Sequence, residues 1–191
     1  MGSATSSPQM KRPEMVFFFI SNNYYLYHII IMITKFEGRW SFLSNFYACS
    51  IEHQGIKYPS VEHFYVAMKV NDQQLINGVY YTPGDFREMI SKIKSAGQVK
   101  KIGSKVKLRT GWDEKKLEFM NWAIREKFKD EKLASLLLST GEQELIEGNF
   151  WKDYFWGVCN GKGENHLGKI LMEVRNELRG VKKTGLEEIL K

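Results

Sequence analysis

One acidic residue, Asp153, lies within a run of aromatic residues near the C-terminal end of the 191-residue chain. The run reads F-W-K-D-Y-F-W over residues 150–156, and a loop spaced by glycines follows it. Apolar residues then recur from Leu167 to Leu178 at the spacing of one helix face, which predicts an amphipathic helix that ends at Gly180. A carboxylate beside flat rings and a flexible loop that begins a helix suit an anionic ligand with a flat ring.

A second candidate acid, Glu62, lies in the first turn of a helix predicted over residues 61–70, with Ser60 as its cap. The helix dipole favours a negative charge at this position. We therefore expect the pKa of Glu62 to be lowered, unless burial opposes the dipole, and its side chain to be ionised. Lys69 is predicted on the same helix face. The alternative is a solvated glutamate that matches the dipole and has no further role.

The composition indicates an ordinary soluble domain with a preference for anionic partners. The formal net charge is +6 and the pI about 9.2, which favours phosphorylated metabolites, nucleotides or nucleic acid. Cys49 and Cys159 are far apart, and neither they nor the four histidines show metal-ligand spacing. We therefore expect a reduced, cytoplasmic protein without a metal or other cofactor.

The predicted fold class is a mainly α-helical (α+β) single compact domain over residues 32–180, with a small antiparallel β-hairpin. Strand patterns flank a turn at 53–55, and a further short strand is predicted at 144–147. Apolar periodicity and caps predict the helices, which span residues 61–70, 83–95, 114–129, 133–138 and 167–179.

The two ends of the chain read as additions to this domain. Residues 1–31 combine a Ser- and Pro-rich start with two interrupted apolar runs, and we expect a dispensable leader, with Met32 as an alternative start. A membrane-associated segment is the alternative, but a bilayer span needs about 20 mostly apolar residues. Residues 181–191 are predicted to form a charged tail or a short final helix.

The glycine-spaced loop before His166 is weak as a motif on its own. It lacks the G-K-[ST] of a phosphate-binding Walker loop and the spacing of a dinucleotide fingerprint. Its place before a helix still offers backbone N–H groups to a phosphate. Asn165 is either the N-cap of that helix or a ligand contact.

Several motifs, taken in order, carry a family resemblance. They are F-E-G-R-W-S-F-L-S-N-F-Y, Y-P-S-V-E-H-F-Y-V-A-M-K, R-T-G-W-D, L-S-T-G, L-I-E and D-Y-F-W-G-V-C-N-G-K-G-E-N-H-L-G-K-I-L-M-E-V-R. Together they resemble the NADAR family, also called YbiA-like, from about residue 33 to 179. The resemblance implies a compact, mostly helical fold that hydrolyses N-glycosidic bonds between a ribose and a base. Some members are linked to phosphoribosylated pyrimidines of riboflavin synthesis, and others to removal of ADP-ribose from guanine in nucleic acid.

The resemblance also implies site residues. Glu62 and Asp153 match the acidic positions of the family. Further pocket positions are matched by Asn45, Lys69, Trp112, Trp156 and Asn165. Two features depart from the family pattern: Val66 stands where glutamine is usual, and the segment 78–88 looks longer than in many members, which could reshape the substrate entrance.

Breaking a ribosyl C–N bond builds positive charge on the sugar, and the leaving base must be neutralised. Glycosidases use one ionised and one protonated carboxylate for this. We expect Glu62 to be the ionised residue and Asp153, desolvated by its aromatic neighbours, to hold its proton, although the opposite assignment stays open. Trp156 or Trp112 is expected to stack on the base, and Lys69 and the loop before His166 to face phosphate.

The sequence leaves the substrate open between two kinds of partner. A rim of cations around the pocket would favour a modified base in nucleic acid, and a basic cluster could supply it, comprising Lys92, Lys94, Lys100, Lys101, Lys105, Lys107 and Arg109. Apolar residues alternate with these cations, as on the wet side of a buried segment. We therefore favour a small phosphorylated ribosyl metabolite. A non-catalytic module that binds ADP-ribose or a nucleotide is the alternative outside the enzymes.

Overall fold

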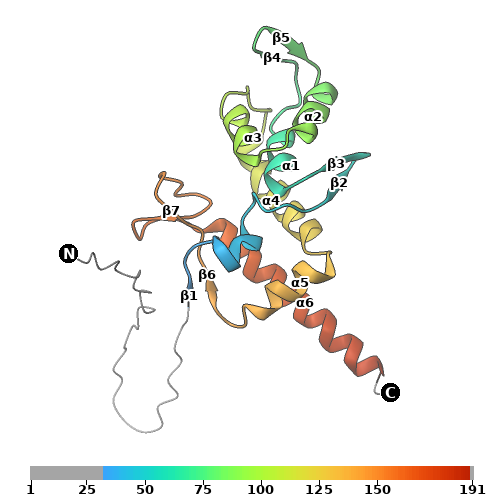
Figure 1. The fold of residues 1–191 in the computed structure, drawn as a ribbon, viewed down its shortest axis with the longest axis vertical. Helices are drawn as coiled ribbons and strands as arrows, with labels where there is room; N and C mark the ends of the chain where they lie inside the picture. Colours follow the sequence, from blue (N-terminus) through green and yellow to red (C-terminus); the bar gives the residue numbers. More distant parts are fainter. Residues whose placement is uncertain (1–31, 190–191) are drawn as a thin grey trace, which may run out of the picture.

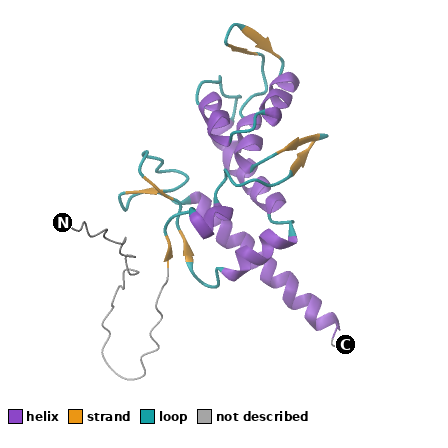
Figure 2. Ribbon diagram, in the orientation of Figure 1, coloured by secondary structure: helices purple, strands orange, loops and turns teal. Residues whose placement is uncertain are grey.

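The computed structural model describes residues 32–189, and the side chains among them as far as residue 180. Helices dominate, and the strands are short and lie at the periphery (Figure 2). In chain order the elements are β1 (Met32–Ile33), η1 (Gly38–Leu43), β2 (Ile51–His53), β3 (Ile56–Tyr58), α1 (Val61–Met68), β4 (Gln74–Ile76), β5 (Val79–Tyr81), α2 (Pro83–Lys92), α3 (Ala96–Gly103), α4 (Trp112–Lys127), α5 (Glu131–Ser139), β6 (Glu144–Leu145), β7 (Gly148–Asn149), β8 (Val158–Cys159) and α6 (His166–Ile189).

Helix α1 is the centre of the fold. All eight of its residues are buried, and it packs against α2, α3 and α4 (Figure 1). Val66, the departure from the family pattern, faces α3 so closely that a side chain at Gly103 would collide with it. A helix covered on all sides must bury whatever polar residues it carries, so the surroundings of Glu62 differ from those of a surface helix.

Local capping explains why several helices begin where they do. Ser60 Oγ accepts a hydrogen bond from His63 N at 3.4 Å at the start of α1. Thr82 and Asp85 form a reciprocal capping box at the start of α2, with Pro83 in the first turn. The Asp130 carboxylate accepts from the N–H of Lys132 at the start of α5. Each of these starts follows from the local sequence.

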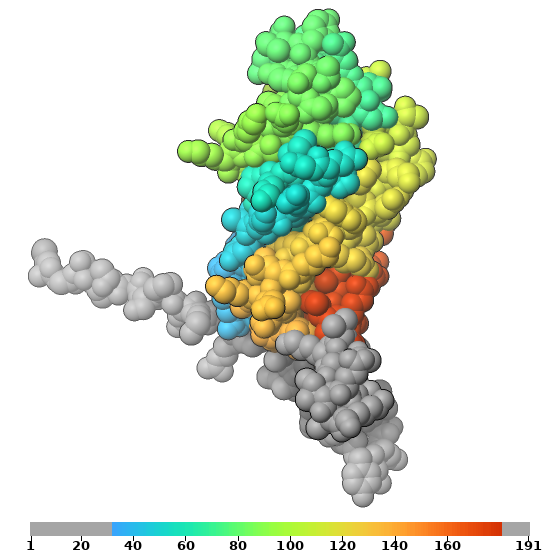
Figure 3. All heavy atoms as spheres, turned by 90° about the vertical axis from the view of Figure 1, so that its right-hand side faces the viewer, coloured from blue at the N-terminus to red at the C-terminus, as the bar shows by residue number. Residues whose placement is uncertain are grey.

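The sheets are two-stranded. The antiparallel hairpin β2–β3 turns at Gln54 and Gly55, both with positive φ, as predicted. A second antiparallel hairpin pairs β4 with β5, and β1 pairs with β6 in parallel register. The mainly helical α+β class is therefore confirmed. In the space-filling view, the segment from β4 to α3 forms one end of the molecule, and α5 with the described part of α6 lies toward the other (Figure 3).

Two helices differ from the sequence prediction. The basic segment expected as a solvated face or the wet side of a buried segment begins with a helix, α3, capped by Ser95. Helix α6 continues through Gly180 to Ile189, because Gly180 keeps a helical backbone and does not adopt the left-handed conformation of a terminating glycine. Among residues 32–189, no helix combines the length and apolar character that crossing a bilayer requires. The predicted leader, residues 1–31, lies outside the described residues.

Candidate active site

A pocket of about 290 Å³ lies where α1, α3 and α4 meet the segment from β6 to the start of α6. Five of the seven site residues predicted from sequence line it, and Trp112 and Asn165 do not. Its lining combines three carboxylates, two lysines and several aromatic rings, and consists of Ser44, Asn45, Phe46, Glu62, Tyr65, Lys69, Lys100, Ser104, Met120, Glu147, Trp151, Asp153, Trp156 and Leu167.

Glu62 is buried, with 8% of its surface exposed. Burial raises its pKa from 4.5 to about 7; Lys100 and Lys69 oppose this rise, and the charge of Asp153 adds to it. Burial therefore opposes and overturns the lowered pKa that the helix dipole alone would give Glu62. Helix α1 is wrapped by three other helices, and the loss of water around Glu62 outweighs any effect of the helix dipole on its pKa.

Asp153 is half-buried on the loop between β7 and β8. Its Oδ1 accepts a hydrogen bond from Trp156 N at 2.9 Å, and its backbone is held by Asn149, whose side chain bonds both Asp153 N and Asp153 O. Its negative charge raises the pKa of Glu62 and of a third carboxylate, Glu147. The raised pKa of Glu62 goes against its expected role as the permanently ionised group.

Glu147 is a pocket residue that the sequence reasoning missed. It lines the pocket two residues after β6, and burial followed by the charge of Asp153 raises its pKa to about 7. The L-I-E motif containing it was part of the family resemblance, but it was interpreted only as a strand. Its position within a family motif, at the end of a predicted strand, was the available signal.

Asn45 lies between η1 and β2 and lines the pocket. Its backbone carbonyl accepts from Glu62 N at 3.0 Å. Its side-chain Oδ1 is buried without a hydrogen-bond partner among the described residues. The preceding residue, Ser44, is held by the buried Lys127, whose Nζ donates to Ser44 O at 2.8 Å. Asn45 therefore offers an acceptor to a ligand from a fixed backbone.

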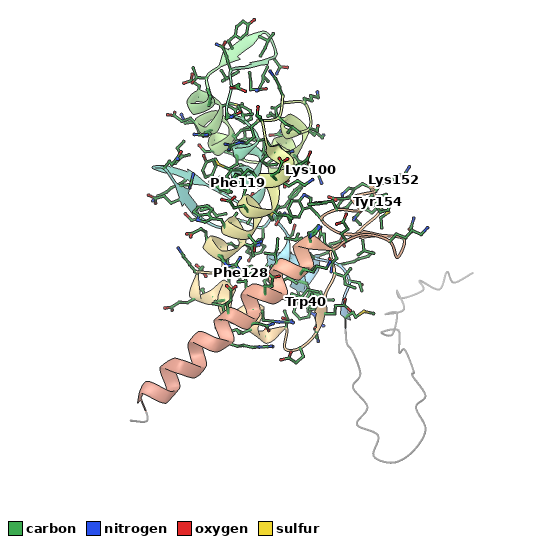
Figure 4. All side chains as sticks on the ribbon, turned by 180° about the vertical axis from the view of Figure 1, so that it is seen from behind. Trp40, Lys100, Phe119, Phe128, Lys152 and Tyr154 are labelled. Carbon is green, nitrogen blue, oxygen red and sulfur yellow. The ribbon has the colours of Figure 1, made fainter. Side chains whose placement is uncertain are left out.

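Two lysines line the pocket in different ways. Lys69 Nζ donates to Gly103 O at 3.0 Å, and burial lowers its pKa. Lys100 is exposed, and its Nζ lies 5.0 Å from the ring centroid of Trp151 and 5.7 Å from that of Phe46. Figure 4 shows Lys100 on α3 facing the loop that carries Lys152 and Tyr154. Lys100 is the better placed of the two to receive an anion from solvent.

Of the two tryptophans predicted to stack on the base, only Trp156 lines the pocket. Trp156 lines the pocket and meets Tyr65 edge to face at 5.5 Å. Trp112 is 7% exposed and packs behind Tyr65 and against Phe119, so it belongs to the core. Phe46 and Trp151, 44% and 49% exposed, present rings at the pocket that the sequence reasoning did not assign.

Asn165 is neither an N-cap through its side chain nor a pocket residue. Its Oδ1 accepts from Glu147 N at 3.0 Å and its Nδ2 donates to Leu145 O at 2.9 Å. The loop expected to face phosphate does not line the pocket either. Glu164 in that loop pairs with His166 at 2.8 Å. This loop does not face a ligand, because its polar side chains bond to other protein groups. Asn165 bonds the backbone of Glu147 and Leu145, and Glu164 pairs with His166.

The longer segment 78–88 does not reshape the pocket. The hairpin β4–β5 lies on the other side of α3, where it borders a separate cavity of about 200 Å³. Lys101 and Lys105 line that second cavity, whereas Lys100 lines the first. Arg109 donates to Met68 O. The basic cluster is thus divided over several surfaces and does not form a rim around the carboxylates.

Fold and pocket together define a mainly helical domain with a carboxylate-lined ligand site. A profile of the NADAR domain matches residues 33–179, and the chain belongs to this family. It is 34% identical over 139 residues to the N-glycosidase YbiA of Escherichia coli K12, covering 71% of this chain and 79% of that protein. The NMR structure of E. coli YbiA superimposes with a TM-score of 0.64 at 32% identity, covering 79% of this chain and 87% of that one.

A longer relative carries the same domain. A riboflavin biosynthesis protein of Vibrio vulnificus is 39% identical over 142 residues, which cover 72% of this chain. The match spans 35% of that protein's own length. The shared part is therefore one portion of the Vibrio protein.

Proposed function

We propose that this protein, an N-glycosidase of the NADAR family, hydrolyses the ribosyl–base C–N bond of a phosphoribosylated aminopyrimidine of the riboflavin pathway. The observation that carries the proposal is the pairing of Glu62 and Asp153 in one pocket. Burial raises the pKa of Glu62 to about 7, and the charge of the neighbouring Asp153 adds to this rise. In such a pair of carboxylates, one group can transfer a proton while the other stabilises positive charge.

Asp153 is assigned the electrostatic role. As the C–N bond lengthens, the ribosyl carbon gains positive charge, and a fixed carboxylate beside it lowers the energy of that state. Asn149 and Trp156 N hold Asp153 in place, so it does not have to reorganise. Glu62, with a pKa of about 7, is assigned the role of general base that accepts the proton of the attacking water. A base that titrates near neutral pH is suited to that transfer.

The remaining pocket groups match the two ends of the substrate. Trp156, Trp151 and Phe46 offer rings to a flat pyrimidine, and the Asn45 Oδ1 can accept from one of its amino groups. Lys100, exposed beside the rings, can meet the phosphate. The pocket volume of about 290 Å³ and the division of the basic cluster favour a small metabolite over a polyanion.

One observation favours the second candidate, removal of ADP-ribose from guanine in nucleic acid. Phe150 and Tyr154, 84% and 46% exposed, flank the pocket residue Trp151 and could stack on neighbouring bases. A non-catalytic binding module would use the same rings. Three carboxylates in an anion pocket weigh against such a module, because they oppose phosphate binding.

The test compares both substrates in a salt series. Release of free base from ribosylaminopyrimidine phosphate, with a weak salt dependence, is expected. Turnover of ADP-ribosylated DNA without turnover of the pyrimidine would favour the second candidate. The affinity for the DNA should then fall by roughly one power of salt concentration per phosphate contact. Tight binding without release of base would favour the module. We also propose that the protein works in a reducing, cytoplasmic environment, since the thiols of Cys49 and Cys159 are both free.

A further inference from the structure

The backbone around Glu147 is held by contacts from several segments. Glu147 N donates to Asn165 Oδ1 at 3.0 Å, and Glu147 O accepts from Val158 N at 2.8 Å. The same Asn165 side chain also bonds Leu145 O at 2.9 Å. Asn165 adopts a positive φ of 53°, a conformation in which asparagine is enriched. The turn that presents Glu147 is thus fixed on both sides.

Close backbone packing adds to this support. A side chain at Gly157 would collide with the carbonyl oxygen of Glu147 and press on its Cγ. A side chain at Gly148, the residue after Glu147, would collide with the carbonyl of Thr34. Only glycines allow the chain to approach this closely, so the backbone at Glu147 is fixed, as the support of a preorganised catalytic group requires.

The side chain of Glu147 is not used by this supporting structure. Its Oε2 is buried and has no hydrogen-bond partner among the described residues, yet the side chain lines the pocket that holds Glu62 and Asp153. A buried oxygen without a partner is costly and is typical of a group that meets a ligand.

We propose that Glu147 is a further catalytic residue, the general acid that protonates the leaving base. This inference rests on the proposed function. The C1′–N bond breaks and its electron pair goes to the base nitrogen, which takes the proton of Glu147. Water adds to C1′ and gives a proton to Glu62. The products are the free base and ribose phosphate, and transfer of one proton from Glu62 to Glu147, directly or through solvent, restores both groups.

The charges around Glu147 fit this role. Burial raises its pKa most, the carboxylates of Asp153 and Glu37 raise it further, and Lys100 and Lys127 lower it, which leaves a pKa of about 7. A carboxyl group with such a pKa keeps a proton in a substantial share of molecules near neutral pH. A general acid requires this.

The test uses two aryl ribofuranoside 5-phosphates, so that it does not depend on the natural base. Phenolate needs a proton to leave, whereas 4-nitrophenolate leaves as an anion. We expect Glu147→Gln to slow the phenyl substrate by about a hundredfold and the nitrophenyl substrate far less. Glu62→Gln is expected to slow both. Glu144→Gln, an exposed neighbour on β6, is the matched control and should slow neither.

The pH profile of the wild-type protein gives a second readout that needs no variant to fold. With the phenyl substrate, activity should fall above about pH 7 as Glu147 loses its proton; with the nitrophenyl substrate this fall should be absent. Equal slowing of both substrates by Glu147→Gln, or identical high-pH limbs for both, would overturn the proposal. If the wild type cleaves the aryl ribosides but not the pyrimidine, only the proposed natural substrate fails. Cleavage of none of them overturns both proposals.

Discussion

The carboxylate of Asp153 and the carboxylate of Glu62 come from distant parts of the chain, and the charge of Asp153 contributes to the raised pKa of Glu62. Asp153 lies on the loop between β7 and β8, and Glu62 lies on the central helix α1. Lys100 and Lys69 pull the pKa of Glu62 in the opposite direction. The protonation of Glu62 therefore depends on groups from three separate segments, each of which can be changed independently.

Replacing Glu62 by glutamine should lower kcat by about a hundredfold or more while the fold is retained. The variant should also be more stable than the wild type above pH 7. The folded pKa of about 7 exceeds the unfolded value of 4.5, so the folded wild type binds more protons between these values, and its unfolding free energy falls as pH rises through them. Glutamine does not titrate, so the variant avoids this loss of unfolding free energy, which amounts to about 3 kcal/mol.

Thermal unfolding of both proteins from pH 5 to pH 8 checks this. The stability difference should be largest at pH 8 and shrink toward pH 5. A glutamine variant that is less stable at every pH would assign Glu62 to the structural core and not to catalysis.

Asp153→Asn should reduce kcat by about a hundredfold, because the ribosyl cation loses its opposing charge. Loss of that charge should also lower the pKa of Glu62. The low-pH limb of the pH–rate profile should therefore shift toward lower pH. Asp113→Asn, an exposed residue on α4, serves as the control. Unchanged activity in Asp153→Asn would remove this residue from catalysis.

The two tryptophans should respond differently to alanine. Trp112→Ala should destabilise the protein by about 3–5 kcal/mol, because it empties a core position behind Tyr65. Trp156→Ala should raise KM about tenfold through loss of a stacking ring. Denaturant unfolding and steady-state kinetics separate the two effects. A pure KM effect in Trp112→Ala would instead place that residue against the substrate.

Lys100→Ala should raise KM for a phosphorylated substrate about tenfold and leave KM for the dephosphorylated ribosyl compound unchanged. Lys101→Ala removes the same charge from the next position of α3, which borders the other cavity. It should change neither value. Equal effects of both variants would mean that only the overall charge of α3 matters.

A chain that starts at Met32 should keep the activity of the full-length protein. Met32 is the first residue of β1, which pairs with Glu144 on β6, so such a chain retains this sheet. The measurement is specific activity of the shortened and full-length proteins at equal concentration. Loss of activity, or partition of the full chain into membranes, would contradict the prediction that residues 1–31 are dispensable.

The sequence alone determined the features that depend on neighbouring residues. Ser60, Thr82 and the turn at Gln54 and Gly55 act within a few positions of themselves, so the helix starts and the hairpin were predictable. The order of the family motifs likewise identified the family and directed attention to Glu62 and Asp153. These predictions needed no knowledge of what covers each element.

Only the tertiary structure decided which polar groups lose water and which charges meet. Glu62 was expected to be ionised because its helix position is visible in the sequence, whereas the burial of α1 on all sides is not. Asn165 was expected to cap α6 or bind a ligand, but its side chain holds the turn that presents Glu147. Desolvation and charge coupling fall off over a few ångströms in space and not along the chain, so the raised pKa values of Glu62 and Glu147 arise only when the segments pack.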